Sequence, residues 1–286
     1  MKRFRDIKAK ASKFGTKPKL VVACPYDKNI LLALSMAQLE TLVDIIIIGS
    51  KAKVEGILNQ YEIRRMYTDF INIEHEDMAI KESYRILLSN EADIIMKGIV
   101  QTKDFMSVLL SNKSFIKRKL LTHVAIYDVP TFNRLLFVSD SSILIEPTIE
   151  QKKVIVDNAL DLLNYLEITT PKVAIISSTE VPNPKIKSSV DAIELMNLYT
   201  KVESDISIFG PLGIDNAISK EAAELKNIKS KVGGNADLLI MPNLDSGNIF
   251  CKGLTYIGGM ESAGIVMGAK KPIILTISNG FLQLVK

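Results

Sequence analysis

Short apolar runs alternate with helix-like segments along most of the chain. Leu20–Cys24 and Ile94–Met96 are apolar at consecutive positions, and Asp44–Gly49 contains a run of isoleucines, as strands covered on both faces do. Elsewhere apolar residues recur every three or four positions, which predicts amphipathic helices over Ile30–Leu39, Lys53–Leu58 and Met78–Ser89. This alternation of strands and helices predicts an α/β fold with a parallel, doubly wound sheet.

The second half of the chain continues this alternation. Val124–Asp128 and Leu135–Ser139 are expected to be strands that pair through the turn between them. A long helix over Ile149–Leu166 is expected to link two domains. Further strands and helices are predicted over Val173–Ile176, Val190–Tyr199, Ile206–Phe209, Lys220–Lys226, Leu238–Met241, Asn248–Gly258, Ile265–Met267 and Ile273–Thr276. We therefore expect a first domain over residues 1–148, to which 277–286 return, and a second over residues 149–276.

Composition and charge narrow the possible partners. The 286 residues are 47% hydrophobic and carry a net charge of +4, which suits anionic small molecules and does not require nucleic acid. The basic segment Met1–Lys17 is expected to be a solvated helix at a domain edge. No apolar stretch is long enough to span a bilayer, and none resembles a secretory signal, so a cytoplasmic protein without a membrane partner is expected. Cys24 and Cys251 are expected to be reduced thiols, and no residues have metal-ligand spacing.

The segment Ala92–Ser111 is a candidate anion site. Lys97 and Gly98 follow a predicted buried strand, and a helix is predicted to begin near Thr102. Main-chain N–H groups and the positive end of a helix dipole favour phosphate at such a position, where Gln101 and Thr102 supply further donors. The alternative is structural: Thr102 caps the helix, Gly98 permits the turn, and Lys97 is solvated.

Polar residues also follow most of the other predicted strands. Ligands bind outside the carboxyl ends of strands in open α/β sheets, so these residues are expected to share one cleft. Asn, Asp and Ser are ordinary loop residues as well, and each cluster has that alternative explanation. The candidate binding residues are Asn183, Lys185, Asp215, Asn216, Asp245 and Asn248, and the candidate catalytic residues are His123 and Asp140.

Five motifs resemble the phosphate acetyl/butyryltransferase family, most closely its butyryltransferase branch. They occur in the family's order and are MKGIVQTKDF (Met96–Phe105), LTHVAIYDVP (Leu121–Pro130), NPK (Asn183–Lys185), GPLGIDNAIS (Gly210–Ser219) and GNADLLIMPNLDSGNIFCKGL (Gly234–Leu254). The resemblance implies a two-domain isocitrate/isopropylmalate-dehydrogenase-like fold with an interdomain cleft and a homo-oligomer, usually a dimer formed through the second domain. It implies exchange of a short acyl group between CoA and phosphate, giving acyl phosphate, with no cofactor and no metal.

The sequence departs from this family pattern near its last strand. The family has a Ser-Arg pair and then an aspartate, where this chain has Ile277, Ser278 and Gly280. Ser278 is kept as a candidate catalytic residue. We therefore consider a phosphate acyltransferase with reduced activity and, alternatively, a degenerate member that binds CoA, acyl phosphate or phosphate without turnover. A metal- and nucleotide-dependent dehydrogenase of the same fold is the third hypothesis, and the absence of a clustered aspartate set argues against it.

Overall fold

The computed structural model describes residues 2–13, 15–118, 120–199 and 206–275, which form two compact units. The N-terminal unit holds the described residues from Arg5 to 118 and those from Glu261 onward. The central unit holds Leu120–Met260 and the described residues up to Phe4. These units divide the chain at other positions than the expected boundary between 148 and 149. The residues 277–286 of that expectation lie outside the described part.

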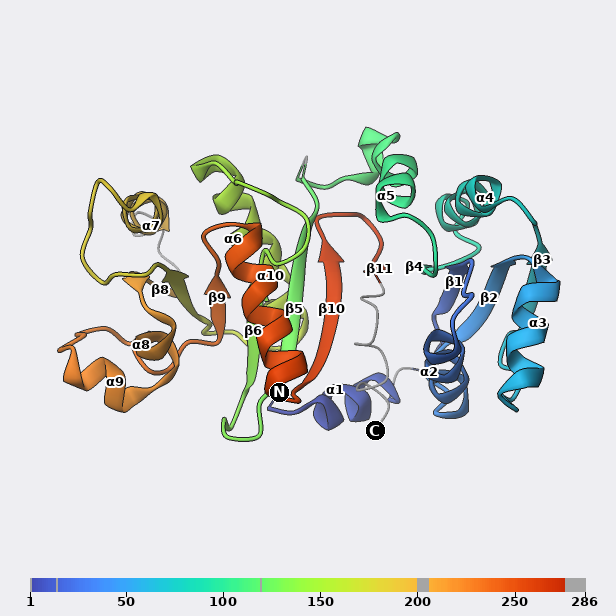
Figure 1. Cartoon of the computed structure of the whole chain (residues 1–286), viewed down its shortest axis with the longest axis horizontal. Coiled ribbons are helices and arrows are strands. Elements are labelled where there is room, and N and C mark those ends of the chain that lie inside the picture. Colours follow the sequence, from blue (N-terminus) through green and yellow to red (C-terminus); the bar gives the residue numbers. More distant parts are fainter. Residues whose placement is uncertain (1, 14, 119, 200–205, 276–286) are drawn as a thin grey trace. The chain divides into compact units, whose positions relative to one another are not determined.

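The sheet of the N-terminal unit has the strand order β3-β2-β1-β4-β11-β10 (Figure 1). All of these pairings are parallel except that of β10 with β11. The strands are β1 (Lys19–Ala23), β2 (Asp44–Gly49), β3 (Asp69–Asn72), β4 (Ile94–Lys97), β10 (Glu261–Met267) and β11 (Ile273–Leu275). The helices are α1 (Phe4–Ala11), α2 (Lys28–Leu39), α3 (Lys51–Gln60), α4 (Glu76–Leu88), α5 (Thr102–Leu110) and the 3-10 turn η1 (Lys113–Phe115).

Helices cover both faces of this sheet. Side chains alternate between the faces of a strand, so Leu20 and Val22 of β1 point to one side and Val21 to the other. Leu20 and Val22 belong to a buried cluster with residues of α2 and α3, while α4 contacts β1, β2 and β4. Val21 and Val22 are fully buried, as the apolar runs predict for a sheet covered on both faces.

The sheet of the central unit has the order β5-β6-β9-β7-β8. β5 and β6 form an antiparallel pair, and the other pairings are parallel. The strands are β5 (Thr122–Asp128), β6 (Leu135–Ser139), β7 (Lys172–Ile176), β8 (Ser207–Leu212) and β9 (Leu238–Ile240). The helices are α6 (Ile149–Tyr165), α7 (Lys187–Tyr199), α8 (Ile214–Ile218), α9 (Lys220–Leu225) and α10 (Leu244–Lys252), with the π-helical turn η2 (Gly253–Ile257).

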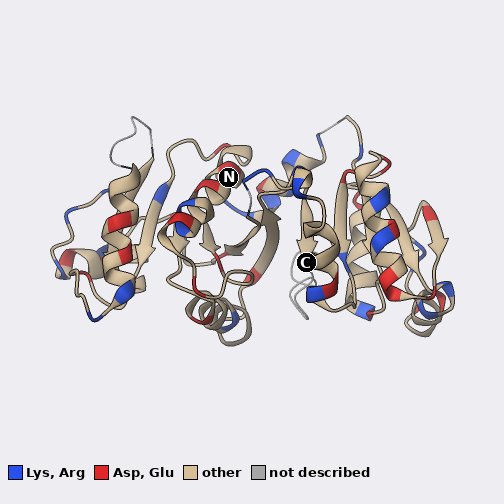
Figure 2. Cartoon of the chain, turned by 90° about the horizontal axis from the view of Figure 1, so that it is seen from above, with Lys and Arg blue, Asp and Glu red and all other residues tan. Residues whose placement is uncertain are grey.

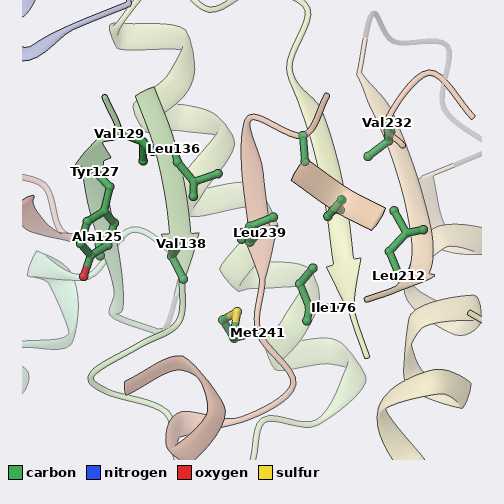
Figure 3. Close-up of a cluster of buried hydrophobic side chains, with 13 residues drawn as sticks. Ala125, Tyr127, Val129, Leu136, Val138, Ile176, Leu212, Val232, Leu239 and Met241 are labelled. Carbon is green, nitrogen blue, oxygen red and sulfur yellow. The ribbon is translucent and has the colours of Figure 1, made fainter. Parts of the chain in front are cut away.

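The central sheet is likewise covered on both faces. Tyr127 donates from its hydroxyl to the Cys251 carbonyl of α10, at 2.9 Å. Asn158 of α6 donates to the Thr122 hydroxyl at 3.1 Å, and Thr122 points to the face opposite Tyr127. Figure 3 shows the apolar cluster on the Tyr127 face, which includes Val138 and Leu239. Figure 2 shows acidic and basic residues interspersed along the helices of both units.

The structure confirms the α/β fold with its expected parallel strands, and it confirms the expected pairing of β5 with β6, which is antiparallel. Besides the 3-10 turn η1, the short elements β3 and α8 were not expected. β3 is an edge strand with polar, exposed residues at both ends, so it lacks the apolar run that identifies the inner strands. α8 has five residues, too few for helical periodicity to be recognised.

Gly98 brings the end of β4 against the end of β1. Its N–H donates to the Ala23 carbonyl at 2.8 Å, and the next N–H, of Ile99, donates to the Cys24 carbonyl at 2.8 Å. A Cβ atom at Gly98 would lie 2.2 Å from the Cys24 oxygen and 2.4 Å from the Ala23 oxygen. The glycine is therefore required by the backbone packing of β1, and its N–H is already occupied.

We predict that Gly98→Ala lowers the free energy of unfolding by at least about 2 kcal/mol, because main-chain atoms of β1 would have to move. Denaturant unfolding followed by circular dichroism measures this change. The control is Gly56→Ala in α3, where a Cβ meets nothing within 4 Å and should stabilise by up to about 1 kcal/mol. Equal denaturation midpoints for Gly98→Ala and wild type would contradict the packing argument.

Candidate functional site

Open α/β sheets bind ligands at the carboxyl edge where the strand order reverses, and the sheet of the N-terminal unit has such a point. The chain leaves β1 toward β2 and β3 on one side, and β4 lies on the other, so the strand order reverses between β1 and β4. The loop after β1 leads into α2, where Asp27 caps the helix by accepting from Asn29 N and Ile30 N. The loop after β4 leads into α5. Both loops therefore present helix N-termini at this edge.

Lys97 has a structural role that the sequence did not indicate. The residue is 7% exposed, and its Nζ donates to the carbonyl oxygens of Gly98 and Val100, both at 3.1 Å. Burial lowers the pKa of Lys97 below its ordinary value. The ammonium therefore holds the loop that precedes α5, and any anion contact would be added to these bonds.

Gln101 and Thr102 are exposed at the N-terminus of α5. Gln101 occupies the cap position and makes no side-chain capping bond, so Thr102 is the first helical residue and not the cap. Both side chains are thus available beside the helix N-terminus, where the dipole favours negative charge. The structure therefore contradicts the alternative in which Thr102 caps the helix, and the anion site at Gln101 and Thr102 stays a prediction.

His123 and Asp140 lie together in the central unit, at the start of β5 and the end of β6. The main-chain N–H of His123 donates to Asp140 Oδ2 at 3.1 Å, and its Nδ1 lies 3.0 Å from Ser141 Oγ. His123 is 1% exposed, and burial lowers its pKa to about 4. Its Nε2 is buried and has no hydrogen-bond partner within the described ranges. His123 is thus a buried, neutral histidine at pH 7.

Asp140 organises the loop after β6. Its Oδ1 accepts from Ser142 N at 2.7 Å and from Ile143 N at 2.9 Å, so both carboxylate oxygens bind main-chain N–H groups. Burial raises the pKa of Asp140 above its ordinary value despite these bonds. Asn248 of α10 donates to the Ser141 carbonyl at 3.3 Å. His123, Asp140 and Asn248 therefore belong to one cluster, in which the first two have no exposed polar atom to offer as a base.

A pocket of about 650 Å³ lies at the carboxyl ends of β7, β8 and β9 in the central unit. Of the candidate residues, Asp215 lines it directly. Most of its charged lining was not predicted from the sequence. The lining comprises Glu146, Lys152, Ile176, Ser177, Ser178, Glu180, Lys187, Ser188, Asp191, Gly213, Ile214, Asp215, Lys226, Met241, Pro242, Asn243 and Ser246.

One ion cluster in this pocket centres on Asp191 of α7. Lys152 Nζ of α6 lies 2.7 Å from Asp191 Oδ2, which also accepts from Lys187 Nζ. Burial alone would raise the pKa of Asp191, but the two lysine bonds outweigh it, so the pKa is lowered and the carboxylate is ionised. Lys152 shares the buried face of α6 with Ile155 and Ala159. A lysine at helical spacing within an apolar stripe is the sequence signal that identifies this cluster.

A second ion cluster connects Asp215 and Asn216. Lys226 Nζ lies 2.6 Å from Glu180 Oε1 and 3.5 Å from Asp215 Oδ2. Asn216 is fully buried, and its Nδ2 also donates to Glu180 Oε1. The hydrogen bond from Lys226 is the main cause of a lowered pKa at Glu180. Asn216 therefore positions Glu180, while Asp215 is exposed to the pocket.

The remaining candidates have no shared cluster. Asn183 and Lys185 are exposed before α7, where the Asn183 side-chain oxygen accepts from Lys185 N at 3.0 Å. Asp245 is exposed in the first turn of α10. Ser278 lies outside the described residues. Within the described ranges, no group of three or more His, Cys, Asp or Glu side chains is arranged to hold a metal ion, and no helix is long and apolar enough to cross a membrane.

Comparisons with known proteins identify the group of proteins to which these motifs correspond. The family model described as phosphate acetyl/butaryl transferase matches residues 83–282. A phosphate acetyltransferase of Rickettsia felis is 36% identical over 96% of this chain and 79% of its own. A phosphate butyryltransferase of Clostridium beijerinckii is 31% identical over 96% of this chain and 91% of its own. The crystal structure of a branched-chain phosphotransacylase from Enterococcus faecalis V583 superposes with a TM-score of 0.81 at 26% identity, covering 94% of this chain and 96% of that one.

We predict that Lys97→Met lowers the free energy of unfolding by about 1–3 kcal/mol, because the Gly98 and Val100 carbonyls lose a charged donor. The sequence alone suggested an anion contact without a stability role. Lys103→Met, at an exposed lysine of α5, is the control and should leave stability nearly unchanged. Urea denaturation of both variants decides between these roles, since a merely solvated Lys97 would make them equal.

We predict that His123 makes the protein lose stability as the pH falls from about 6.5 to about 4. Its pKa is lowered to about 4 in the folded chain, so the unfolded chain binds the proton first in this window. The loss amounts to about 3 kcal/mol at the lower limit. His123→Gln should remove this part of the pH dependence, whereas His75→Gln, at an exposed histidine, should keep it. Equal slopes of unfolding free energy against pH in all three proteins would exclude this role for His123.

Proposed function

The chain belongs to the phosphate acetyl/butaryl transferase family, and we propose that it exchanges a short-chain acyl group between CoA and inorganic phosphate. The observation that carries this proposal is the identity of 30% or more, over nearly the whole chain, to relatives named phosphate acetyltransferase and phosphate butyryltransferase. In the forward direction a phosphate oxygen attacks the thioester carbonyl, and the thiolate of CoA leaves and is protonated. The products are an acyl phosphate and CoA.

The exposed edge at α5 is the part of the N-terminal unit that we assign to an anionic substrate. Gln101 and Thr102 offer side-chain donors next to the N-terminus of α5, and Lys97 fixes the loop that carries them. In the central unit, the exposed candidates are Asn183 and Lys185 before α7 and Asp245 at the start of α10. The amide, hydroxyl and ammonium donors among these residues act mainly by positioning the substrates and by stabilising the oxygen that gains charge, whereas the Asp245 carboxylate accepts hydrogen bonds.

His123 and Asp140 are proposed as positioning residues and not as the general base. Both are almost completely buried, and both Asp140 oxygens accept main-chain N–H groups. Their bonds fix the Ser141 segment, whose carbonyl binds the Asn248 side chain. Asn248 is the member of this cluster that we assign to substrate contact.

The reaction as written requires no cofactor and no metal, because neither a redox step nor a metal-activated water is involved. We propose a cytoplasmic enzyme that works as a homo-oligomer, in agreement with the resemblance stated from the motifs. Preference for a butyryl or branched acyl group is part of the proposal. The names of the relatives support both acetyl and longer groups, so the acyl chain is the first variable to test.

Reduced turnover is the second part of the proposal. Ile277, Ser278 and Gly280 stand where the resemblance expects serine, arginine and aspartate. Loss of a general base costs on the order of 10²–10⁴-fold in rate, and loss of an anion partner has a comparable cost. A protein that binds CoA or phosphate without turnover is the limiting case of this loss.

We predict that the protein releases CoA from butyryl-CoA only when phosphate is present. The turnover rate should be below the range of about 1–10³ per second that is typical of enzymes. A chromogenic thiol reagent measures this release, with acetyl-CoA and isobutyryl-CoA as alternative substrates. Omitting phosphate controls for hydrolysis. Turnover within the typical range would show that another residue replaces the missing base. Absent turnover together with measurable CoA binding would select the binding-protein alternative.

A further inference from the structure

The pocket of the central unit contains a buried ammonium group with unused hydrogen-bonding capacity. The Lys152 side chain is 4% exposed and lines the pocket. Its Nζ donates to Asp191 Oδ2 at 2.7 Å. Among the described residues, Nζ has no second hydrogen-bond acceptor. An ammonium group has three N–H donors, and a buried charge is stable only when its donors are satisfied. The remaining donors are therefore available to a molecule in the pocket.

The surroundings of Lys152 favour a negatively charged acceptor. Asp191 is shared between Lys152 and Lys187, and Glu146, which also lines the pocket, adds a negative charge that acts on Lys152. The hydrogen-bond donors of this cluster, and not its net charge, therefore favour an anionic acceptor. Ser188 follows Lys187 in α7, and its hydroxyl lies 2.9 Å from the hydroxyl of Ser177. Both serines line the pocket. Two ammonium groups beside two hydroxyls are a typical donor set for a phosphate or carboxylate group.

The second ion cluster of the lining has an excess of carboxylates. Glu180 and Asp215 share a single lysine, Lys226, so one negative charge is not balanced. The carboxylate oxygens of this cluster accept hydrogen bonds from amino or hydroxyl groups. The pocket therefore offers ammonium and hydroxyl donors at the first cluster and carboxylate acceptors at the second, and its volume of about 650 Å³ is within the range of small-molecule sites.

We propose that this pocket binds a small dipolar molecule whose oxyanion occupies the Lys152–Lys187 cluster and whose amino or hydroxyl group faces the Glu180–Asp215 cluster. The oxyanion is a phosphate monoester or a carboxylate, which have the same chemistry toward lysine and serine. This site is separate from the acyl-exchange proposal, because it follows from the charges of the pocket and involves neither CoA nor a thioester.

Isothermal titration calorimetry with three matched probes tests the proposal on the full chain. Phosphoethanolamine carries both a phosphate and an amine, propyl phosphate lacks the amine, and β-alanine replaces the phosphate with a carboxylate. We expect at least one of the two dipolar probes, phosphoethanolamine or β-alanine, to bind. If the phosphate is the preferred oxyanion, propyl phosphate should bind about tenfold more weakly than phosphoethanolamine. Tighter binding of β-alanine identifies the carboxylate. Absence of binding by all three probes at millimolar concentration would overturn the proposal.

Variants then locate the binding. Lys187→Gln and Ser188→Ala should each weaken the better dipolar probe, by about tenfold for the lysine. The matched control is Lys153→Gln. Lys153 pairs with Asp157 four residues later on α6, just as Lys187 pairs with Asp191 on α7. Unlike Lys187, Lys153 does not line the pocket. Glu180→Gln should reduce binding of the dipolar probes and leave propyl phosphate nearly unchanged. Equal effects of Lys187→Gln and Lys153→Gln would place the binding elsewhere and refute the site.

Acyl exchange by the wild-type protein is measured separately. Its absence would contradict the proposed function and leave the pocket proposal standing, since the calorimetric probes are not substrates of that reaction. Conversely, normal acyl exchange without probe binding would refute the pocket proposal alone.

Discussion

Burial of both faces of two largely parallel sheets determines where this protein can carry polar chemistry. Inner strands such as β1 and β9 are apolar on consecutive residues because helices cover each side of them. Polar groups of the sheet then gather at the strand ends, where loops and helix N-termini supply hydrogen bonds. The Lys97 loop, the Asp140 loop and the pocket beside β7 all lie at such ends. The position of candidate chemistry is therefore a consequence of the strand arrangement, and its composition depends on individual side chains.

Most strands could be predicted from the sequence, because they depend on the pattern of apolar residues at consecutive positions. β2 has the predicted bounds, and the β5–β6 pair follows from two apolar runs separated by a turn. The domain limits were harder to predict from the sequence, because they depend on which strands pair across long separations in the chain. β6 pairs with β9, about a hundred residues later, which places β5 and β6 in the central unit. No local pattern in either strand contains that information.

The roles of single polar residues were the least predictable part. Lys97 and Lys152 are both buried lysines, yet the first binds main-chain carbonyls and the second an ionised aspartate. The sequence identified Lys97 from its place after a strand, whereas Lys152 lies within a helix and was missed. His123 and Asp140 were identified as possible bases from the same kind of position, and the structure buries both. A residue's place at a strand end indicates proximity to a site, but only the neighbouring atoms decide whether its polar group is occupied.

The family motifs have the same limitation, for a physical reason. The segment GPLGIDNAIS contains the end of β8 and all of α8, and its Asn216 holds Glu180 from a fully buried position. In the last motif, Gly247 permits α10 to approach the Asp140 carbonyl, where a Cβ would lie at 2.5 Å. Residues of this kind build the edge of the sheet, and their packing role does not depend on whether the chain catalyses a reaction. Strong motif similarity therefore establishes the architecture and the family. Catalytic rate depends instead on the few groups that touch reacting atoms, and the proposed reduction in turnover rests on the departure of residues 277–280 from the pattern that the resemblance implies.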